Sequence, residues 1–358
     1  MMPRLPDDVL DPRFYDHLGE IPEDLFDERL YWSVELVERY AREWAVELAG
    51  LLGLERAVER AGDAGATAGA VVASLELDPE VRSAASWILE QLAAAGLLYA
   101  AGPPTTPEHR RFSSAGPLRP SHRPRIREAA LEQSPGNEPF LDLLDAAGEV
   151  LPRLAAGETT GEAALLGAAG IGRWIRYFSN DNPVYALNNR LAALAAAARL
   201  PRPSRTGAAT GSGAELLEVG AGAGSASAAL LEAMEERNLL DRIGRFRITE
   251  PAAMLRRRAE RTLPRRFPLS ESGGELVFAD LDVDRPWAEQ GVEPESLDLV
   301  YGVNVLHVAR NLGASLAQAF DALAPGGWLV AGECLRPLPG QPVAAELPFL
   351  LLEGFRDV

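Results

Sequence analysis

The first half of the chain has the hydrophobic pattern of a group of helices. In residues 28–54, apolar side chains recur at the spacing of one helix face. The same periodicity predicts helices at 66–75 and 79–96, and it resumes after a connector rich in Pro and Arg. We therefore expect an N-terminal helical domain over residues 1–114 and a helical connector over 115–200.

The second half changes to short apolar runs that alternate with helical segments. The predicted helices are 224–238, 251–262 and 311–323, and a candidate strand precedes each of them. This alternation is typical of a parallel, doubly wound α/β sheet. A run of Pro, Gly, Ser and Thr at 201–213 marks the boundary, so we expect the sheet domain over 214–358.

Within the N-terminal domain, two helices are followed by two short apolar runs around the loop 102–108, which is the pattern of a winged helix. The helix that would enter a DNA groove offers Arg82 as its one cation, beside Asp78, Glu80 and Glu90. A helix that reads DNA needs several cations for phosphates and base edges. The pattern therefore favours a lid or packing module over a transcription factor.

The composition of the chain further limits the classes of partner and ligand that the protein could bind. The 35 basic residues, all of them arginine, stand against 52 acidic ones, for a formal net charge of −17. Attraction to phosphates needs a basic field, so this balance argues against a nucleic-acid binder. The single cysteine, Cys334, excludes an internal disulfide, and four histidines without metal-ligand spacing predict that no metal is bound.

The sequence predicts neither a targeting segment nor a membrane span. The N-terminus is acidic and interrupted by prolines, unlike a secretory signal. Apolar stretches such as 191–198 are shorter than the ~20 residues that a helix needs to cross a bilayer. We therefore expect a cytoplasmic protein.

The first predicted strand leads into the turn Glu218-Val219-Gly220-Ala221-Gly222-Ala223-Gly224. Glycines let backbone approach a ligand closely, and the next helix directs its amide dipole there. A dinucleotide site would have the spacing GxGxxG. The acid before the first glycine is badly placed for a pyrophosphate and well placed for a cationic amino group. The turn resembles motif I of the class I S-adenosylmethionine-dependent methyltransferases, which implies that Glu218, Gly220, Gly222 and Gly224 hold S-adenosylmethionine.

Acidic residues also end the next two predicted strands. Glu250 is suited to accept hydrogen bonds from two ribose hydroxyls, while Asp280 and Leu281 are suited to an adenine amine and ring face. Each is as readily an ordinary strand-end residue. Together with motif I, in the same order along the sheet edge, they favour a cofactor site.

The segment Asn304-Val305-Leu306-His307, followed by LAPGGWLVAGE up to Glu333, resembles the C-methyltransferase domains of modular polyketide synthases. The resemblance covers nearly the whole chain. It implies that His307 is the catalytic base and Glu333 its partner, 26 residues later (333 − 307), and that the upstream half is a helical lid. We also assign Asn304 to the cofactor site.

The chemistry of these residues fits that role. Histidine titrates near neutral pH and is suited to remove a proton, and a carboxylate on its other nitrogen fixes the tautomer. A carbon between a ketone and a thioester would lose a proton to such a base. The competing interpretation of His307 is a half-buried histidine at a strand end.

The resemblance implies methylation of a small-molecule or carrier-tethered acyl substrate of the polyketide type. Two alternatives remain open. One is an O- or N-methyltransferase that uses the same base on a natural product. The other is a non-catalytic S-adenosylmethionine-binding or scaffold module.

An arginine-rich run, Arg256-Arg257-Arg258 with Arg261, Arg265 and Arg266, is a second candidate site. An acidic carrier protein or its phosphate could dock there by charge. Such runs are also common on solvated helix faces.

Only 25 residues follow Glu333 (358 − 333). A class I methyltransferase sheet has seven strands, the last two forming an antiparallel hairpin beside the fifth. The sequence therefore predicts a C-terminally truncated sheet whose fifth strand is an apolar edge.

Overall fold

The computed structural model describes residues 23–106, 108–167, 170–200, 213–334 and 341–353. They form two compact units. The sheet unit contains Glu23–Phe26, Phe178–Asn180 and Tyr185–Cys334, and the helical unit contains Asp27–Tyr177, Asp181–Val184 and 341–353. Most of the expected boundary at 201–213, and the N-terminal segment judged for targeting, lie outside the described residues. The two units cut across the expected divisions, because residues from 185 onward group with the sheet and those from 341 onward with the helices.

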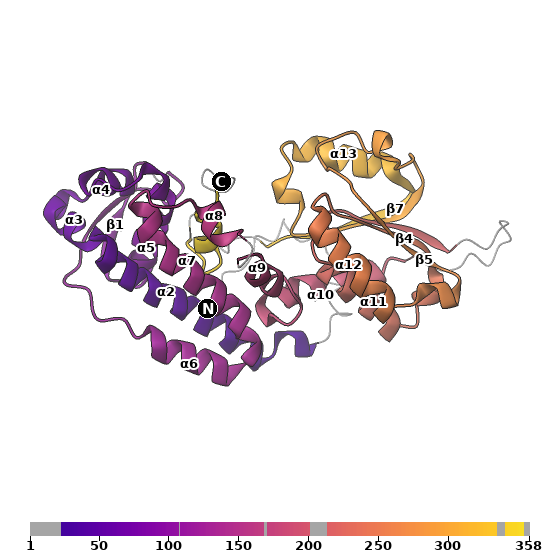
Figure 1. The fold of residues 1–358 in the computed structure, drawn as a ribbon, viewed down its shortest axis with the longest axis horizontal. Helices are drawn as coiled ribbons and strands as arrows, with labels where there is room; N and C mark the ends of the chain where they lie inside the picture. The colour runs from indigo at the N-terminus through magenta and orange to yellow at the C-terminus, as the bar shows by residue number, and fades with distance from the viewer. Residues whose placement is uncertain (1–22, 107, 168–169, 201–212, 335–340, 354–358) are drawn as a thin grey trace. The chain divides into compact units, whose positions relative to one another are not determined.

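The sheet unit contains five parallel strands in the order β5-β4-β3-β6-β7 (Figure 1). Their bounds are β3 (Ala214–Glu218), β4 (Ile243–Thr249), β5 (Glu275–Ala279), β6 (Leu297–Val303) and β7 (Leu323–Gly332). Helices connect β3 to β4, β4 to β5 and β6 to β7, so the predicted parallel α/β sheet is confirmed.

Helices cover both faces of this sheet (Figure 1). The cluster on one face joins α10 (Pro183–Ala197), α11 (Ser225–Glu236) and α12 (Ala253–Arg266), and that on the other contains α13 (Leu312–Ala322). Successive strand residues point to opposite faces, so Leu216 enters the first cluster and Leu217 the second. Short 3-10 turns complete the unit: η1 (Glu23–Phe26), η5 (Leu240–Arg242), η6 (Leu269–Ser272), η7 (Ala288–Gln290) and η8 (Leu306–Val308).

The strand order places a topological switch point at β3. This strand pairs with β4 on one side and with β6 on the other. The connections that leave β3 and β6 therefore run in opposite directions along the sheet. In open α/β sheets, ligands bind beyond the carboxyl ends of the strands at such a point.

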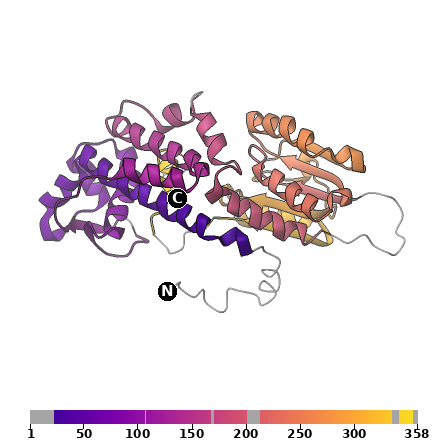
Figure 2. The same cartoon turned by 90° about the horizontal axis from the view of Figure 1, so that it is seen from below.

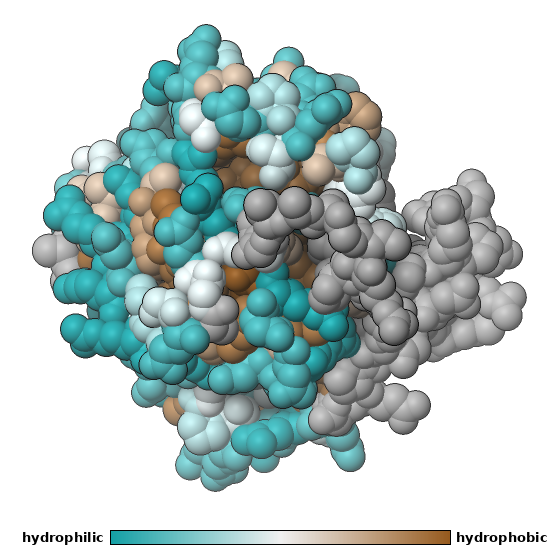
Figure 3. Space-filling model, turned by 90° about the vertical axis from the view of Figure 1, so that its right-hand side faces the viewer, coloured by the Kyte–Doolittle hydropathy of each residue, from teal (hydrophilic) through white to brown (hydrophobic). Residues whose placement is uncertain are grey.

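In the described part of the chain, β7 is an edge strand whose partner is β6. Trp328 on β7 is 47% exposed and Phe320 on α13 is 78% exposed. Figure 3, which views the molecule from the right-hand side of Figure 1, shows hydrophobic patches on a mostly hydrophilic surface. An apolar edge of the sheet was predicted.

The helical unit is built around the long helix α2 (Figure 2). Its helices are α2 (Glu28–Leu52), α3 (Leu54–Ala61), α4 (Ala68–Ser74), α5 (Arg82–Ala94), α6 (Arg123–Gln133), α7 (Glu138–Ala155), α8 (Gly161–Leu165), α9 (Ile171–Tyr177) and α14 (Glu346–Leu350), with turns η2 (Gly62–Ala64), η3 (Pro79–Val81) and η4 (Pro135–Asn137). Asp27 caps α2 by accepting a hydrogen bond from the Leu30 amide at 2.7 Å, and Gly53 ends it in a left-handed conformation. None of the described helices is long and apolar enough to cross a membrane.

The winged-helix pattern is present in this unit. After α4 and α5, the strands β1 (Leu98–Ala101) and β2 (Arg111–Ser114) form an antiparallel hairpin, and Ala66 bridges to Phe112. The helix that would enter a DNA groove is α5. Its Trp87 Nε1 donates to the Val343 carbonyl at 2.9 Å, and α5 packs against α14. This face of α5 is therefore engaged within the chain.

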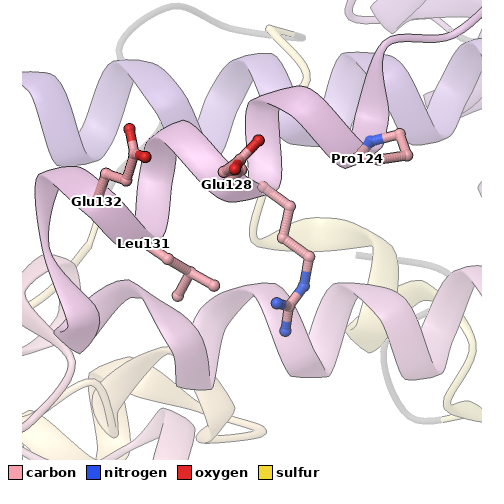
Figure 4. A pocket seen from close by; sticks show the side chains of 5 residues that line it. Pro124, Glu128, Leu131 and Glu132 are labelled. Atoms are coloured by element: carbon pink, nitrogen blue, oxygen red, sulfur yellow. The ribbon is translucent and has the colours of Figure 1, made fainter.

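Ion pairs rather than apolar contacts hold α6 in place, since Ala130 is the one residue of this helix that is buried. Arg123 lies 3.0 Å from Glu47 and 3.2 Å from Asp145, and Arg127 lies 2.8 Å from Asp142. A shallow pocket runs along α6, as Figure 4 shows, lined by Pro124, Arg127, Glu128, Leu131 and Glu132. None of the predicted site residues lines it.

Candidate cofactor and catalytic site

The glycine turn lies at the carboxyl end of β3, at the switch point. Gly220, Gly222 and Gly224 have positive φ values of 65°, 55° and 91°. A Cβ on Gly220 would lie 2.2 Å from Val305 Cγ2, so the turn touches the loop that leads to His307. A Cβ on Gly222 would meet nothing within 4 Å. The backbone at Gly222 is thus open to a ligand.

Glu218 is the most deeply buried of the predicted site residues that can ionise, at 1% exposure. Its Oε2 accepts a hydrogen bond from the Ser227 hydroxyl, whereas its Oε1 is buried without a hydrogen-bond partner. Burial raises the pKa of Glu218 to about 8, the Ser227 hydrogen bond opposes this shift, and the nearby Glu250 charge adds to it. An unpartnered oxygen of this kind suits a cationic ligand group.

Glu250 joins the end of β4 to the glycine turn. Its Oε2 accepts from the Gly222 amide at 2.9 Å and its Oε1 from the Ala252 amide at 2.8 Å. A carboxylate has about four acceptor positions, so two remain for ligand hydroxyls. Glu250 therefore both supports the turn and retains capacity to bind.

Asp280 and Leu281 follow β5 but differ in environment. Asp280 is exposed, as expected for a residue that meets a ligand. Leu281 is 1% exposed and lies in the cluster that contains Trp287 and Val305. The structure thus places the Leu281 side chain in the core rather than on an open face.

His307 and Glu333 come together although they are 26 residues apart (333 − 307). His307 Nδ1 lies 2.7 Å from Glu333 Oε2, while Glu333 Oε1 accepts from the amides of Val305 at 3.0 Å and Leu306 at 2.7 Å. Burial raises the pKa of Glu333, but the hydrogen bonds from His307 and from these two amides outweigh that effect and lower it below its usual value. Because the ionised carboxylate accepts at Nδ1, the neutral imidazole presents an unprotonated Nε2.

The His307 side chain is 54% exposed and that of Glu333 is 20% exposed. The carboxylate is therefore anchored and the ring is accessible. An accessible basic nitrogen, oriented by a fixed carboxylate, can remove a proton from a bound molecule and then stabilise its own charge.

Asn304 lies between these groups, in a left-handed conformation with φ 52°. Its Oδ1 accepts from Asn188 Nδ2 at 3.0 Å and from the Cys334 amide at 3.1 Å. Its side chain also hydrogen-bonds to Tyr185, whose pKa is raised mainly by burial. Asn304 thus ties the ends of β6 and β7 to α10.

Three residues at this site were not singled out as functional from the sequence. Asn188 lies inside α10, which begins at Pro183, and it also donates to the Gly332 carbonyl at 3.2 Å. Two asparagines in an Ala- and Leu-rich helix are costly for helix propensity and were a usable signal. Ser227 and Tyr185 gave none, since their partners are distant in sequence.

The described residues contain no group of three or more His, Cys, Asp or Glu side chains that could hold a metal ion.

No protein-family model matches the sequence. The chain is 36% identical over 129 residues to highly reducing polyketide synthase 2 of Gibberella zeae, in an alignment covering 34% of this chain and 5% of that synthase. It is 27% identical over 317 residues to the non-reducing polyketide synthase dpmpA of Macrophomina phaseolina, covering 88% of this chain and 14% of the synthase. The chain therefore spans a small part of these relatives.

Solved structures give longer matches. The CurJ carbon methyltransferase superposes with a TM-score of 0.70 and 21% identity, covering 96% of this chain and 82% of that one. The DszA carbon methyltransferase gives 0.70 and 23%, covering 96% and 83%. The CMeT domain of the citrinin polyketide synthase gives 0.66 and 18%, covering 99% and 86%. The predicted resemblance is confirmed: the chain has the fold of the carbon methyltransferase domains of polyketide synthases and resembles polyketide synthases in sequence.

Proposed function

We propose that the chain is an S-adenosylmethionine-dependent methyltransferase that methylates the acidic carbon of a polyketide-type acyl substrate, either free or tethered to a carrier protein. The observation that carries the proposal is the His307–Glu333 pair, at 2.7 Å, in which His307 lies on the loop that touches the glycine turn at the switch point. The polyketide synthase relatives and the fold of the structural neighbours support it.

The residues of the turn fit this cofactor. The partnerless Glu218 Oε1 suits an ammonium group, the open backbone at Gly222 leaves room for the ligand, and Glu250 retains acceptor capacity for hydroxyls. Asp280 and Asn304 would border the same site, whereas Leu281 would support it from the core. When bound, S-adenosylmethionine supplies an electrophilic methyl group.

His307 acts as the base in this proposal. Its Nε2 removes a proton from the carbon between a ketone and a thioester, and the electron pair of the broken C–H bond makes that carbon the nucleophile for the methyl group. Glu333 stabilises the resulting imidazolium through Nδ1 and keeps the ring oriented. The lowered pKa of Glu333 keeps this partner charged at neutral pH.

Replacing His307 by Ala tests this assignment. We expect kcat for a β-ketoacyl thioester to fall by about 10²–10⁴-fold, the usual contribution of a general base. Affinity for S-adenosylhomocysteine, measured by calorimetric titration, should stay close to that of the unmodified chain. A comparable loss of kcat and of affinity for S-adenosylhomocysteine would mean that His307 has only a structural role.

Locating the transferred methyl group separates this function from its alternative. A methyl group on the acidic carbon, found by mass spectrometry and NMR of the product, is the expected result. A methyl group on oxygen or nitrogen would favour tailoring of a hydroxyl or an amine by the same base.

A further inference from the structure

The outer face of α12 has a charge that is exceptional for this protein. The helix Ala253–Arg266 contains six arginines and one glutamate, for a net charge of +5. Since the whole chain carries −17, the remaining residues carry −22. A concentrated positive face on a strongly negative protein limits where an acidic partner can approach.

Two of the six arginines have partners outside α12 itself. Arg266 lies 2.6 Å from Glu232, and Arg256 donates to the Glu250 carbonyl. The other four are exposed: Arg257, Arg258, Arg261 and Arg265. Within the described residues none of these four makes an ion pair, whereas in the helical unit Arg110 lies 2.7 Å from Glu90. We call these four residues the arginine face.

The arginine face is one side of the helix. At 3.6 residues per turn, its members fall within an arc of about 100°, opposite the buried Ala259 and Leu263. Arg257 and Arg261 hydrogen-bond only to backbone carbonyls of their own helix, at 3.2 Å each. Like charges spaced four residues apart destabilise a helix slightly. The four guanidinium groups are therefore available to an outside acceptor.

The face also begins close to the proposed cofactor site. Glu250, whose carboxylate holds the Gly222 amide at 2.9 Å, stands three residues before Ala253, where α12 starts. Gly224 packs against the same helix, since a Cβ there would lie 3.0 Å from Ala259 Cβ. A macromolecule bound along α12 would thus lie next to the edge of the sheet at which methyl transfer is proposed.

We propose that the arginine face docks the acidic carrier protein that delivers the acyl substrate; this rests on the proposed function. Guanidinium groups pair with surface carboxylates through charge-assisted hydrogen bonds, and such contacts speed encounter and fix orientation. A nucleic acid is the less favoured partner, because its phosphates continue along its whole length and would meet the −22 charges beyond α12, whereas a small carrier protein can contact the arginine face alone.

The test uses the full chain and an acidic acyl carrier protein loaded with an acetoacetyl group. The variant is Arg257→Glu with Arg261→Glu, and the matched control is Arg56→Glu with Arg60→Glu. The control arginines are also exposed, four residues apart and without an ion pair, but lie on α3. Both pairs change the net charge equally.

We expect the α12 variant to bind the carrier at least about tenfold more weakly, a loss of about 1.4 kcal/mol, while the α3 variant binds as the unmodified chain does. Added salt should weaken binding by the unmodified chain. Methylation of the same acyl group on N-acetylcysteamine should stay unchanged in both variants.

Equal binding by the two variants, or no carrier binding by the unmodified chain at low salt, would overturn the docking proposal. The docking proposal would also be overturned if the α12 variant lost binding to a DNA duplex but bound the carrier as the unmodified chain does. If carrier binding follows the expectation but neither thioester is methylated, the proposed function fails and the docking face stands.

Discussion

At the scale of single residues, the carboxyl group of Glu218 makes the stability of the fold depend on pH. It is 1% exposed, and burial raises its pKa to about 8 from an ordinary value of 4.5. Between these two values the folded chain holds a proton that the unfolded chain has lost. The free energy of unfolding therefore falls as pH rises through this window, because the unfolded state binds fewer protons.

Replacing Glu218 by Gln should remove this pH dependence. Glutamine resembles the protonated carboxyl in shape and hydrogen bonding, but it cannot ionise. We expect the variant to match the unmodified chain near pH 5 and to be more stable at pH 8, by an amount on the order of a few kcal/mol. Urea unfolding at several pH values measures the difference. Parallel pH profiles for the two chains would show that Glu218 ionises normally.

Much of the candidate site could be predicted from the sequence at this scale, and the reason is local. Glu218, Glu250 and Asp280 stand where strands end, and strand ends are visible in the hydrophobic pattern. The predicted pairing of His307 with Glu333 followed from a resemblance, and the two side chains meet at 2.7 Å. The environment of Leu281 was less predictable, because alternation between the two faces stops once the strand has ended.

At the scale of elements, the turn between β3 and α11 is the place where cofactor binding can be tested separately from folding. At Gly222 a Cβ meets nothing within 4 Å, although φ is 55°. A side chain there would project into the space proposed for the cofactor. The backbone strain of a non-glycine residue in this conformation is about 1–2 kcal/mol.

Gly222→Arg should therefore abolish binding of S-adenosylhomocysteine while the chain stays folded. The matched control is Gly273→Arg, which has the same open surroundings and a φ of 85° but lies at the end of η6. Calorimetric titration measures binding, and circular dichroism checks the fold. The assignment of the turn fails if both variants bind the ligand equally well.

Helix α10 offers a second test at this scale, because its adjacent asparagines contact different parts of the site. Asn188 reaches Asn304 at 3.0 Å and Gly332 at 3.2 Å, whereas Asn189 reaches Asn180 at 2.8 Å. Asn180 in turn donates to the Ser225 carbonyl at the start of α11, at 2.9 Å. One asparagine thus supports the loop of His307 and the other supports the cofactor turn.

Replacing either asparagine by Ala should lower the free energy of unfolding by about 1–2 kcal/mol. The loss comes from buried partners left without a hydrogen bond, and the better helix propensity of Ala offsets part of it. Asn188→Ala should mainly lower kcat, and Asn189→Ala should mainly weaken cofactor affinity. Steady-state kinetics and titration separate the two effects. Identical losses in both parameters would mean that α10 acts only through stability.

The hydrogen bonds of α10 to distant segments could not be predicted from its hydrophobic pattern. Apolar periodicity identified the helix, but the side chain of Asn188 contacts Asn304 and Gly332, more than 100 residues later. Hydrogen bonds between distant segments leave little trace in local periodicity. A polar residue that interrupts an Ala-rich face was the available signal.

At the scale of the whole molecule, the strand order β5-β4-β3-β6-β7 explains why chemistry gathers at one edge. All five strands are parallel, so their carboxyl ends and the residues that follow them share that edge. Strand–helix alternation sufficed to predict this sheet. The grouping of residues from 341 onward with the helical unit depends on contacts such as Trp87 with Val343, which no local pattern predicts.

The most direct test of the central claim is methyl transfer itself. The purified chain is incubated with S-adenosylmethionine carrying an isotopically labelled methyl group and with a β-ketoacyl thioester, and the product is examined by mass spectrometry and NMR. We predict a labelled methyl group on the carbon between the ketone and the thioester, and about 10²–10⁴-fold slower formation of this product by His307→Ala. A folded chain that binds S-adenosylhomocysteine but transfers no methyl group to this carbon would contradict the account.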